Sequence, residues 1–385
     1  MKAYSHSDEE NVRHQAMVRD WVSSALLDAT QGSVLQADLQ VSLRRTNSAL
    51  RAVLAFFTMV IVYAAASLTG IVLHTGRDAG WTILGIWGVI CAVSAWALVR
   101  KARLYRCGVE EALGFLAVSL LAGAIGSIPS WDLPVFVGLL TAVAGGAGVY
   151  LVFGFRYAVV VATVLLGVAP FALKADWIFE RVLSVSMFTL VFFVARYMKR
   201  LYTGSLEEDD LAWVQGVAFS GFYLVCNLIL TGRWSGLYTA SQSGWFYWSS
   251  YAVVWIVPAW ALWLGIRGRD WLLIDLGWLA ALATILTNKS YLSWPRQTWD
   301  PVLLGVLLMG TAVALRRWLA KGPNGERAGF TPVRVLDSEN RALAAASALS
   351  LVLPHAPAAS PSQQPSSFKP GGGQSGGGGA SGDFK

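Results

Sequence analysis

The sequence predicts an all-α protein whose polytopic transmembrane helical bundle crosses a membrane about ten times. Of its 385 residues, 55% are hydrophobic and only 14% are charged, whereas a soluble domain carries roughly 25% charged residues. The apolar residues form long blocks of about 20, the length that crosses about 30 Å of hydrocarbon. The 18 tryptophans fit this class, because indole rings collect at membrane–water interfaces.

The polar segment 1–49 precedes the first apolar block and is expected to form a cytoplasmic segment of two helices. Residues 9–27 place apolar side chains at spacings of three and four. After a turn signal at 28–32, Ser33 is expected to cap a second helix that ends at Leu43. Because so short a unit cannot bury a core alone, we expect it to pack on the spans, with binding of a protein partner as the alternative.

Ten apolar segments follow within the predicted transmembrane domain, residues 50–320. The fifth is the least regular, because it is short and ends at Pro170. The predicted spans cover residues 50–73, 81–99, 111–128, 133–153, 157–173, 177–197, 211–230, 246–266, 271–287 and 302–319.

Basic residues concentrate in alternate connections between these spans. One side carries Arg13, Arg19, Arg44, Arg45, Arg51, Arg100, Lys101, Arg103, Arg106, Arg156, Arg196, Lys199, Arg200, Arg267, Arg269, Arg316, Arg317 and Lys321. The opposite connections carry only Arg77, Lys174, Arg233, Lys289 and Arg296. Since cytoplasmic loops are rich in Lys and Arg, both termini are predicted to be cytoplasmic.

Residues 321–385 are rich in Gly, Pro, Ser and Ala. The apolar run 342–353 is too short to span a bilayer, so a helix lying on the membrane or docked in a groove is the better interpretation. The Gly-rich end, 354–385, cannot bury enough apolar surface to fold and is expected to be disordered. This tail is a second candidate surface for a protein partner.

Polar residues within the spans are few, and two of them are candidate binding residues. Asp275 lies about one turn into the ninth span, where it either pairs with Arg267 or Arg269 or faces the interior of the bundle as part of a binding site. Asn227 is the deepest strong hydrogen-bonding side chain; it forms either a binding site or a hydrogen bond between helices. No span carries a carboxylate near its middle, which argues against a carrier driven by protons or sodium.

Glycines and aromatic residues supply further candidates. Gly145 and Gly146 lie near the middle of the fourth span, where they favour close helix packing, with an unwound binding segment as the alternative. Trp245 and Trp248 belong to a dense aromatic run at the outer face. Such rings form an interfacial belt in contact with membrane lipids, or alternatively a binding surface for sugars or lipid headgroups.

Two charged pairs near span ends have simple structural interpretations. Glu110 and Glu111 begin the third span next to Arg103 and Arg106, and the sequence predicts a solvated pair at the helix N-terminus. Glu180 and Arg181 lie one turn into the sixth span near the outer face, where an interfacial pair is expected.

Composition and spacing exclude several classes of function. Three scattered cysteines and four scattered histidines match neither a disulfide framework nor a metal site. No phosphate-binding glycine loop, nucleophile motif or cofactor motif occurs, so no catalytic residue is predicted. The net charge of +7 is explained by topology, because no basic stripe alternates with aromatic residues as in nucleic-acid-binding proteins.

The order of elements in the first third of the chain resembles a known arrangement. It combines the cytosolic segment VRDWVSSALL at 18–27 with YRCGVEEALGFL at 105–116 and the small-residue helix LLAGAIG at 120–126. This order is similar to that of a bacterial family of multipass membrane proteins of unknown function, in which a short cytosolic helical unit precedes the spans. The resemblance implies a location in the bacterial inner membrane and implies no activity.

These observations favour a non-catalytic membrane protein that handles a small molecule or lipid as a carrier. A carrier would need a polar cavity between spans, at which Asn227, Asp275 and the Gly145–Gly146 pair would converge. A membrane scaffold, with a sealed apolar interior and a docking surface, is the alternative. A third possibility is an enzyme acting on lipid-linked sugar at the outer face, through the aromatic cluster and a carboxylate such as Glu180 or Asp132.

Overall fold

The computed structural model describes most of the chain before Gly322. The described residues are 4, 6–24, 26–39, 41, 43–44, 46–73, 80–128, 133–202, 206–235, 244–295, 297–322 and 330. The short helix predicted at 342–353 and the Gly-rich end both lie outside these residues.

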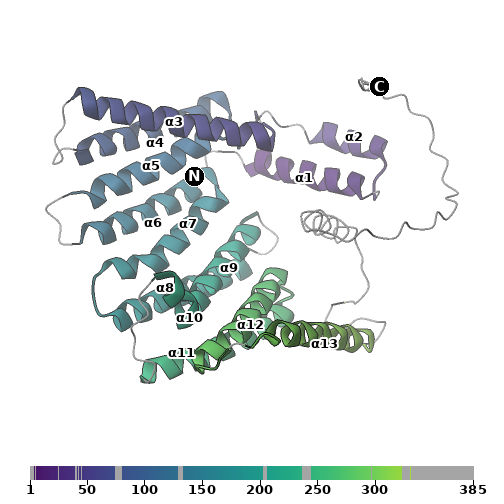
Figure 1. The fold of residues 1–385 in the computed structure, drawn as a ribbon. Helices are drawn as coiled ribbons and strands as arrows, with labels where there is room; N and C mark the ends of the chain where they lie inside the picture. Colours follow the sequence, from purple (N-terminus) through teal and green to yellow (C-terminus); the bar gives the residue numbers. More distant parts are fainter. Residues whose placement is uncertain are drawn as a thin grey trace, which may run out of the picture. The chain divides into compact units, whose positions relative to one another are not determined.

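The described residues form thirteen α-helices and one 3₁₀ helix, with a single isolated bridge between Arg44 and Leu104. Consecutive helices from α3 to α8 pack side by side (Figure 1). The helices are α1 (His6–Ser23), α2 (Ala29–Asp38), α3 (Ser48–Val72), α4 (Gly80–Ala102), α5 (Val109–Gly126), α6 (Pro134–Phe153), α7 (Arg156–Val168), η2 (Ala169–Ala172), α8 (Trp177–Leu201), α9 (Leu206–Cys226), α10 (Leu228–Ser235), α11 (Trp245–Gly268), α12 (Trp271–Tyr291) and α13 (Asp300–Ala320).

Eight of these helices are long and apolar enough to cross a membrane, namely α3, α4, α5, α6, α8, α11, α12 and α13. Each coincides with a predicted span. The chain is therefore all-helical in its described part and has the composition of an integral membrane protein. The predicted fifth and seventh spans have a different local structure.

The fifth predicted span is divided into a 13-residue α-helix, α7, and the short 3₁₀ helix η2. Pro170 lies in η2 and explains the change, because proline has no N–H to donate to the helical ladder. Even so, α7 packs against α6, α8 and α9.

The seventh predicted span, expected to be continuous over 211–230, is interrupted. Helix α9 ends at Cys226, and α10 begins at Leu228. Asn227 alone separates them. An asparagine side chain can bond neighbouring backbone groups and so compete with the helical ladder.

The N-terminal helices α1 and α2 are present, but the predicted cap of α2 is wrong. Asp28, not Ser33, caps the helix: its carboxylate accepts from Ala29 N at 2.8 Å, while the Gln31 side chain accepts from Asp28 N at 3.1 Å. This reciprocal pair is a capping box. Hydrogen bonds, first from the Thr30 hydroxyl, lower the pKa of the Asp28 carboxyl below its usual range.

The N-terminal unit packs on the membrane helices, as expected. The Tyr4 ring meets Tyr105 edge to face with centroids 4.9 Å apart, and Val12 and Leu43 pack against the same core cluster. The unit is also tied by backbone bonds, because Arg44 N donates to Arg103 O and Tyr105 N to Arg44 O, both at 3.0 Å. Tyr4 and Val18 of the unit are buried, whereas Met17, Trp21, Leu26, Val34 and Leu35 stay exposed.

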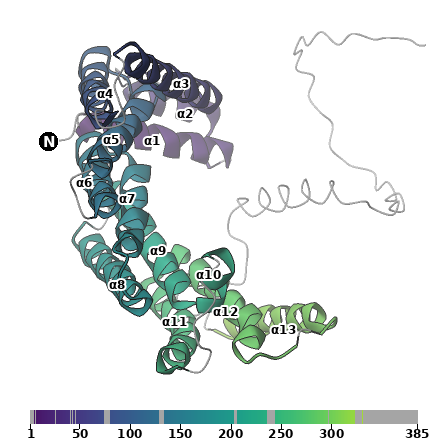
Figure 2. The same ribbon diagram turned by 60° about the vertical axis from the view of Figure 1, so that its left-hand side comes forward.

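The buried core falls into separate clusters. One joins residues of α3 to α7 with the N-terminal unit, a second joins α8, α9, α11 and α12, and a third joins α10 with Tyr247 of α11 and Tyr291 of α12. Helix α13 follows α12 and buries none of its residues (Figure 2). The interruption between α9 and α10 lies where the second cluster meets the third, and Asn227, Tyr223, Thr284 and Thr287 are buried around it.

Candidate functional site

The candidate site is the polar cluster around the break between α9 and α10. Asn227 is fully buried there, with 0% of its surface exposed. Its Nδ2 donates to Tyr223 OH at 3.1 Å and to Thr287 Oγ1 at 3.2 Å, and its Oδ1 accepts from Leu230 N at 3.2 Å. The amide of Asn227 thus uses both of its hydrogens and links α9, α10 and α12.

Side chains take over backbone bonds that the break leaves unmade. Leu228 N donates to Tyr291 OH at 2.8 Å, so a tyrosine from α12 satisfies the first amide of α10. On the other side of the break, Val225 O accepts from Arg181 Nη1 at 3.0 Å. A buried backbone group without a partner costs about 1–3 kcal/mol, so these side chains stabilise the interrupted helix.

A chain of donors runs from Asn227 into the neighbouring helices. Thr284 Oγ1 lies 2.9 Å from both Val254 O and Ala280 O, and 2.9 Å from Tyr223 OH. Because the Thr284 hydrogen is directed to a carbonyl, Tyr223 OH must be the donor to Thr284. The order of donation is therefore Asn227 to Tyr223 to Thr284 to a backbone carbonyl, across α9, α12 and α11.

Tyrosines close one end of this cluster. Tyr247 OH of α11 donates to Tyr291 O at 2.8 Å, and Tyr251 OH donates to Asn288 Oδ1 at 2.7 Å. The rings of Tyr247 and Tyr251 each lie 5.2 Å from that of Tyr291. The hydroxyls fix the register of α11 against α12 at the end where α9 is interrupted.

Arg181 is a site residue that sequence reasoning missed. It was expected at an interface beside Glu180, yet it is only 8% exposed and lies against the break, where Nη1 also donates to Thr231 Oγ1 at 3.1 Å. Glu180 is turned elsewhere and accepts from Ala175 N at 2.8 Å. Adjacent residues on a helix do not face each other. The available signal was an arginine inside an apolar segment, which is costly unless it has partners.

Gln215 lies three turns before Asn227 on α9. It is 2% exposed, and neither its Oε1 nor its Nε2 has a hydrogen-bond partner in the described part of the chain. The buried polar side chains of α9 therefore extend over about 18 Å of the helix at 1.5 Å per residue.

Asn227 and Asp275, the two predicted polar candidates, are not brought together. Asp275 lies on an exposed face of α12 and makes no ion pair or hydrogen bond with any described residue. Thr287, which contacts Asn227, lies about 18 Å further along the same helix. Asp270, not Asp275, caps α12 and pairs with Lys199 at 2.7 Å.

The glycine pair lies in an uninterrupted helix, α6, so the structure contains no unwound segment there. A Cβ on Gly145 would lie 3.1 Å from the Val118 methyls of α5, and one on Gly146 would lie 3.0 Å from Ala158 O of α7. The two glycines therefore let α6 approach both neighbours closely.

The outer aromatic candidates lie on the surface. Trp245 is 75% exposed and Trp248 50% exposed, whereas Tyr247 between them is 5% exposed. The two indoles stand on the first turns of α11, and the Trp248 ring meets Tyr247 and Tyr251 edge to face, with centroids 5.6 and 6.0 Å apart. Asp132, named with them as a possible catalytic carboxylate, lies outside the described residues.

A second polar cluster corrects the expectation for Glu110 and Glu111. Both are buried, at 0% and 8% exposed. Glu111 forms a two-pronged ion pair with Arg51 of α3, with Nε 2.5 Å from Oε2. Glu110 Oε1 accepts from Cys107 N at 2.6 Å. The reason is tertiary: the N-terminal unit covers the start of α5, and burial, followed by the nearby Glu110 carboxylate, raises the pKa of the Tyr4 hydroxyl.

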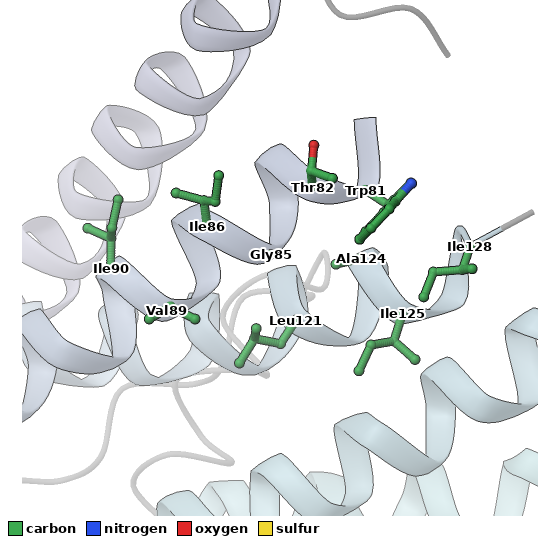
Figure 3. A pocket seen from close by; sticks show the side chains of 10 residues that line it. All are labelled: Trp81, Thr82, Gly85, Ile86, Val89, Ile90, Leu121, Ala124, Ile125 and Ile128. Atoms are coloured by element: carbon green, nitrogen blue, oxygen red, sulfur yellow. The ribbon is translucent and has the colours of Figure 1, made fainter. Parts of the chain in front are cut away.

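Four hollows between helices of the described part are apolar grooves. Figure 3 shows one between α4 and α5, of about 650 Å³, whose labelled side chains are apolar except for the Thr82 hydroxyl and the indole nitrogen of Trp81. It is lined by Trp81, Thr82, Gly85, Ile86, Val89, Ile90, Leu121, Ala124, Ile125 and Ile128. A second groove of about 330 Å³ lies among the aromatic side chains of α8, α9 and α11. Such grooves suit acyl chains.

Within the described ranges, no three His, Cys, Asp or Glu side chains come together in a group that could hold a metal ion. No known protein family, curated sequence or solved structure matches the chain.

Proposed function

We propose that this protein is a carrier that binds a small polar molecule or lipid headgroup at the interruption between α9 and α10. The observation that supports the proposal is the fully buried Asn227 at a one-residue break between two helices, where side chains from neighbouring helices bond the backbone. Discontinuous helices form substrate sites in many carriers, because polar groups at the break can bind a solute inside the membrane.

Asn227, Asp275 and the Gly145–Gly146 pair do not converge on one polar cavity, so the preference for a carrier over the two alternatives rests on the buried polar side chains. A scaffold needs a sealed apolar interior, whereas Gln215 and Asn227 place polar side chains inside the α9 bundle. The N-terminal unit, a candidate docking surface, packs on the chain's own core through Tyr4, Val12 and Leu43, and its exposed apolar side chains are the feature that a scaffold would use. An enzyme acting on lipid-linked sugar would need a carboxylate beside the outer indoles, and Glu180 instead bonds a backbone amide.

The proposal includes ten spans in a bacterial cytoplasmic membrane, with both termini inside. Helix α7 with η2 extends about 27 Å, from 1.5 Å per α-helical and 2.0 Å per 3₁₀ residue, and α9 with α10 completes the seventh span. This places Arg181, Asn227 and Tyr291 towards the outer face. In a cysteine-free background, Cys at Ser293 should react with an impermeant maleimide from outside and Cys at Ala102 should not. Labelling restricted to position 102 would invert the topology.

The test of the carrier role uses the purified full-length protein. Native mass spectrometry would identify small molecules that remain bound, and proteoliposomes would measure uptake of the molecule identified. We expect Asn227→Ala to reduce saturable uptake at least tenfold, and Gln215→Met, about 18 Å along α9 from the break, to reduce it as part of the path that leads to the site. Ser220→Ala is the matched control, because Ser220 lies on the same helix and bonds only Gly216 O of its own turn, at 2.9 Å.

Two results would contradict the carrier proposal. One is normal uptake in folded Asn227→Ala and Gln215→Met proteins. The other is the absence of any retained molecule together with the absence of uptake for a panel of sugars, amino acids, carboxylates and short-chain lipids.

A further inference from the structure

The guanidinium of Arg181 has N–H groups that donate to no described residue. Arg181 is more than nine-tenths buried, and of its nitrogens only Nη1 has partners among the described residues, Val225 O and Thr231 Oγ1. An arginine carries five N–H donors in a planar fork and stays protonated in proteins. The remaining donors of Nε and Nη2 are therefore available to a ligand at the edge of the break.

Among the described residues, no carboxylate balances this charge. The ionisable groups that interact with Arg181 are Tyr291 and Cys226, both neutral in their ordinary state. The sequence contains no Asp or Glu between Asp210 and Asp270, so α10 and α11 supply none. Asp275 lies about 24 Å along α12 from Tyr291.

The end of α9 compensates the charge only in part. A helix C-terminus carries roughly half a negative charge, spread over its last carbonyls, and Arg181 reaches one of them, Val225 O. A full positive charge in a region of low dielectric is costly without a counter-ion. The site is thus complementary to an anion.

We propose that Arg181 is the anion-binding residue of the site, and that the ligand presents a carboxylate or phosphate group to the free side of the guanidinium. Both groups match the arginine fork with two parallel hydrogen bonds. The inference rests on the proposed carrier site and names its substrate class. Tyr291 and Asn227 accept hydrogen bonds from backbone amides of α10 beside the guanidinium.

Two sources share this chemistry, a free anion and the headgroup of a phospholipid. The test therefore uses three probes: inorganic phosphate, succinate, and dihexanoyl phosphatidylglycerol below its micelle concentration. The full-length protein in neutral detergent is titrated with each probe, with sodium chloride at equal ionic strength as the reference, and the rise in Tm gives the half-maximal concentration.

We expect at least one probe to raise the Tm of the wild type. In Arg181→Gln the half-maximal concentration should increase at least tenfold, and in Arg181→Lys several-fold, because lysine keeps the charge but loses the fork. Lys174→Gln is the control, since Lys174 is an exposed basic residue just before α8 and should bind like the wild type. A response to phosphate or succinate indicates a free anion, and a response to the lipid alone indicates a headgroup.

The proposal is overturned if no probe stabilises the wild type beyond sodium chloride, or if Arg181→Gln binds as tightly as the wild type. If Arg181→Gln does not fold, Arg181→Lys decides, and an unchanged half-maximal concentration overturns the proposal. If the protein takes up a neutral or cationic solute in an Asn227-dependent way but binds no anion, the carrier function stands and the anionic substrate class is rejected. If Arg181 binds an anion but the protein transports nothing, the anion site stands and the carrier function is rejected.

Discussion

Gln215 offers the sharpest test of the site, because its stability effect and its functional effect should have opposite signs. Its side chain is 2% exposed in the middle of a helix bundle, and both its Oε1 and Nε2 lack partners among the described residues. Burying an amide without a compensating bond costs about 1–3 kcal/mol in proteins. Methionine has a similar length and no such groups, and swaps that conserve volume are tolerated best.

We therefore expect Gln215→Met to stabilise the folded protein by about 1–3 kcal/mol and to lower uptake. A residue kept at a cost to stability is typical of a functional site. Stability would be measured by denaturant unfolding in a fixed detergent or mixed micelle, and uptake in proteoliposomes from the same preparation. The control is Ser220→Ala, for which we expect a change of no more than about 0.5 kcal/mol, as for mutations away from key contacts.

A loss of stability of more than about 1 kcal/mol in Gln215→Met would refute this reasoning, because it would show that the amide makes favourable bonds in the folded protein. If Gln215→Met is more stable but transports normally, the conclusion that the buried amide lacks partners stands, and Gln215 has no part in transport.

The remaining predictions concern packing and charge. Gly146→Val should destabilise the protein by about 1–3 kcal/mol, because its Cβ would lie 3.0 Å from a backbone carbonyl of α7. Gly148→Ala should be neutral, because its Cβ would meet nothing within 4 Å. Equal melting temperatures of these two variants would contradict the close packing at Gly146. Asp270→Asn should lower the Tm, because it removes the ion pair with Lys199. Asp275→Asn should change neither the Tm nor uptake. An Asp275→Asn protein that is stable but does not transport would instead place the site around Asp275 on α12. Glu111→Gln should lower the free energy of unfolding by about 1–2 kcal/mol. This is less than the roughly 3–5 kcal/mol of a fully buried ion pair, because the side chain of its partner Arg51 is 37% exposed. A double-mutant cycle that finds no coupling between Glu111 and Arg51 would reject the ion pair.

The location of the helices follows from the sequence because it depends on local composition. A block of about 20 apolar residues must satisfy its backbone bonds internally in lipid, so it forms a helix wherever it lies in the fold. This is why the eight long apolar helices coincide with predicted spans. Pro170 marked the irregular end of the fifth predicted span for an equally local reason, its missing N–H.

Environments, by contrast, depend on which helices come together. Glu110 and Glu111 have the residue types and position of a solvated helix start, and it is the packing of α3 and the N-terminal unit around them that makes them buried. Asn227 was recognisable as a polar residue within a span. That it ends α9 depends on Tyr291 and Arg181, which are far away in sequence and provide the missing backbone partners.

The sequence alone thus determined an all-helical protein rich in membrane-spanning segments, because hydrophobic length is a property of each segment by itself. The tertiary structure decided which polar side chains form a site. It directs the Arg181 side chain to the break between α9 and α10. It also leaves Asp275 on an exposed face and places Gly145 and Gly146 against two neighbouring helices. The physical reason is that desolvation and hydrogen bonding are properties of contacts between segments, and one segment's residues cannot specify them.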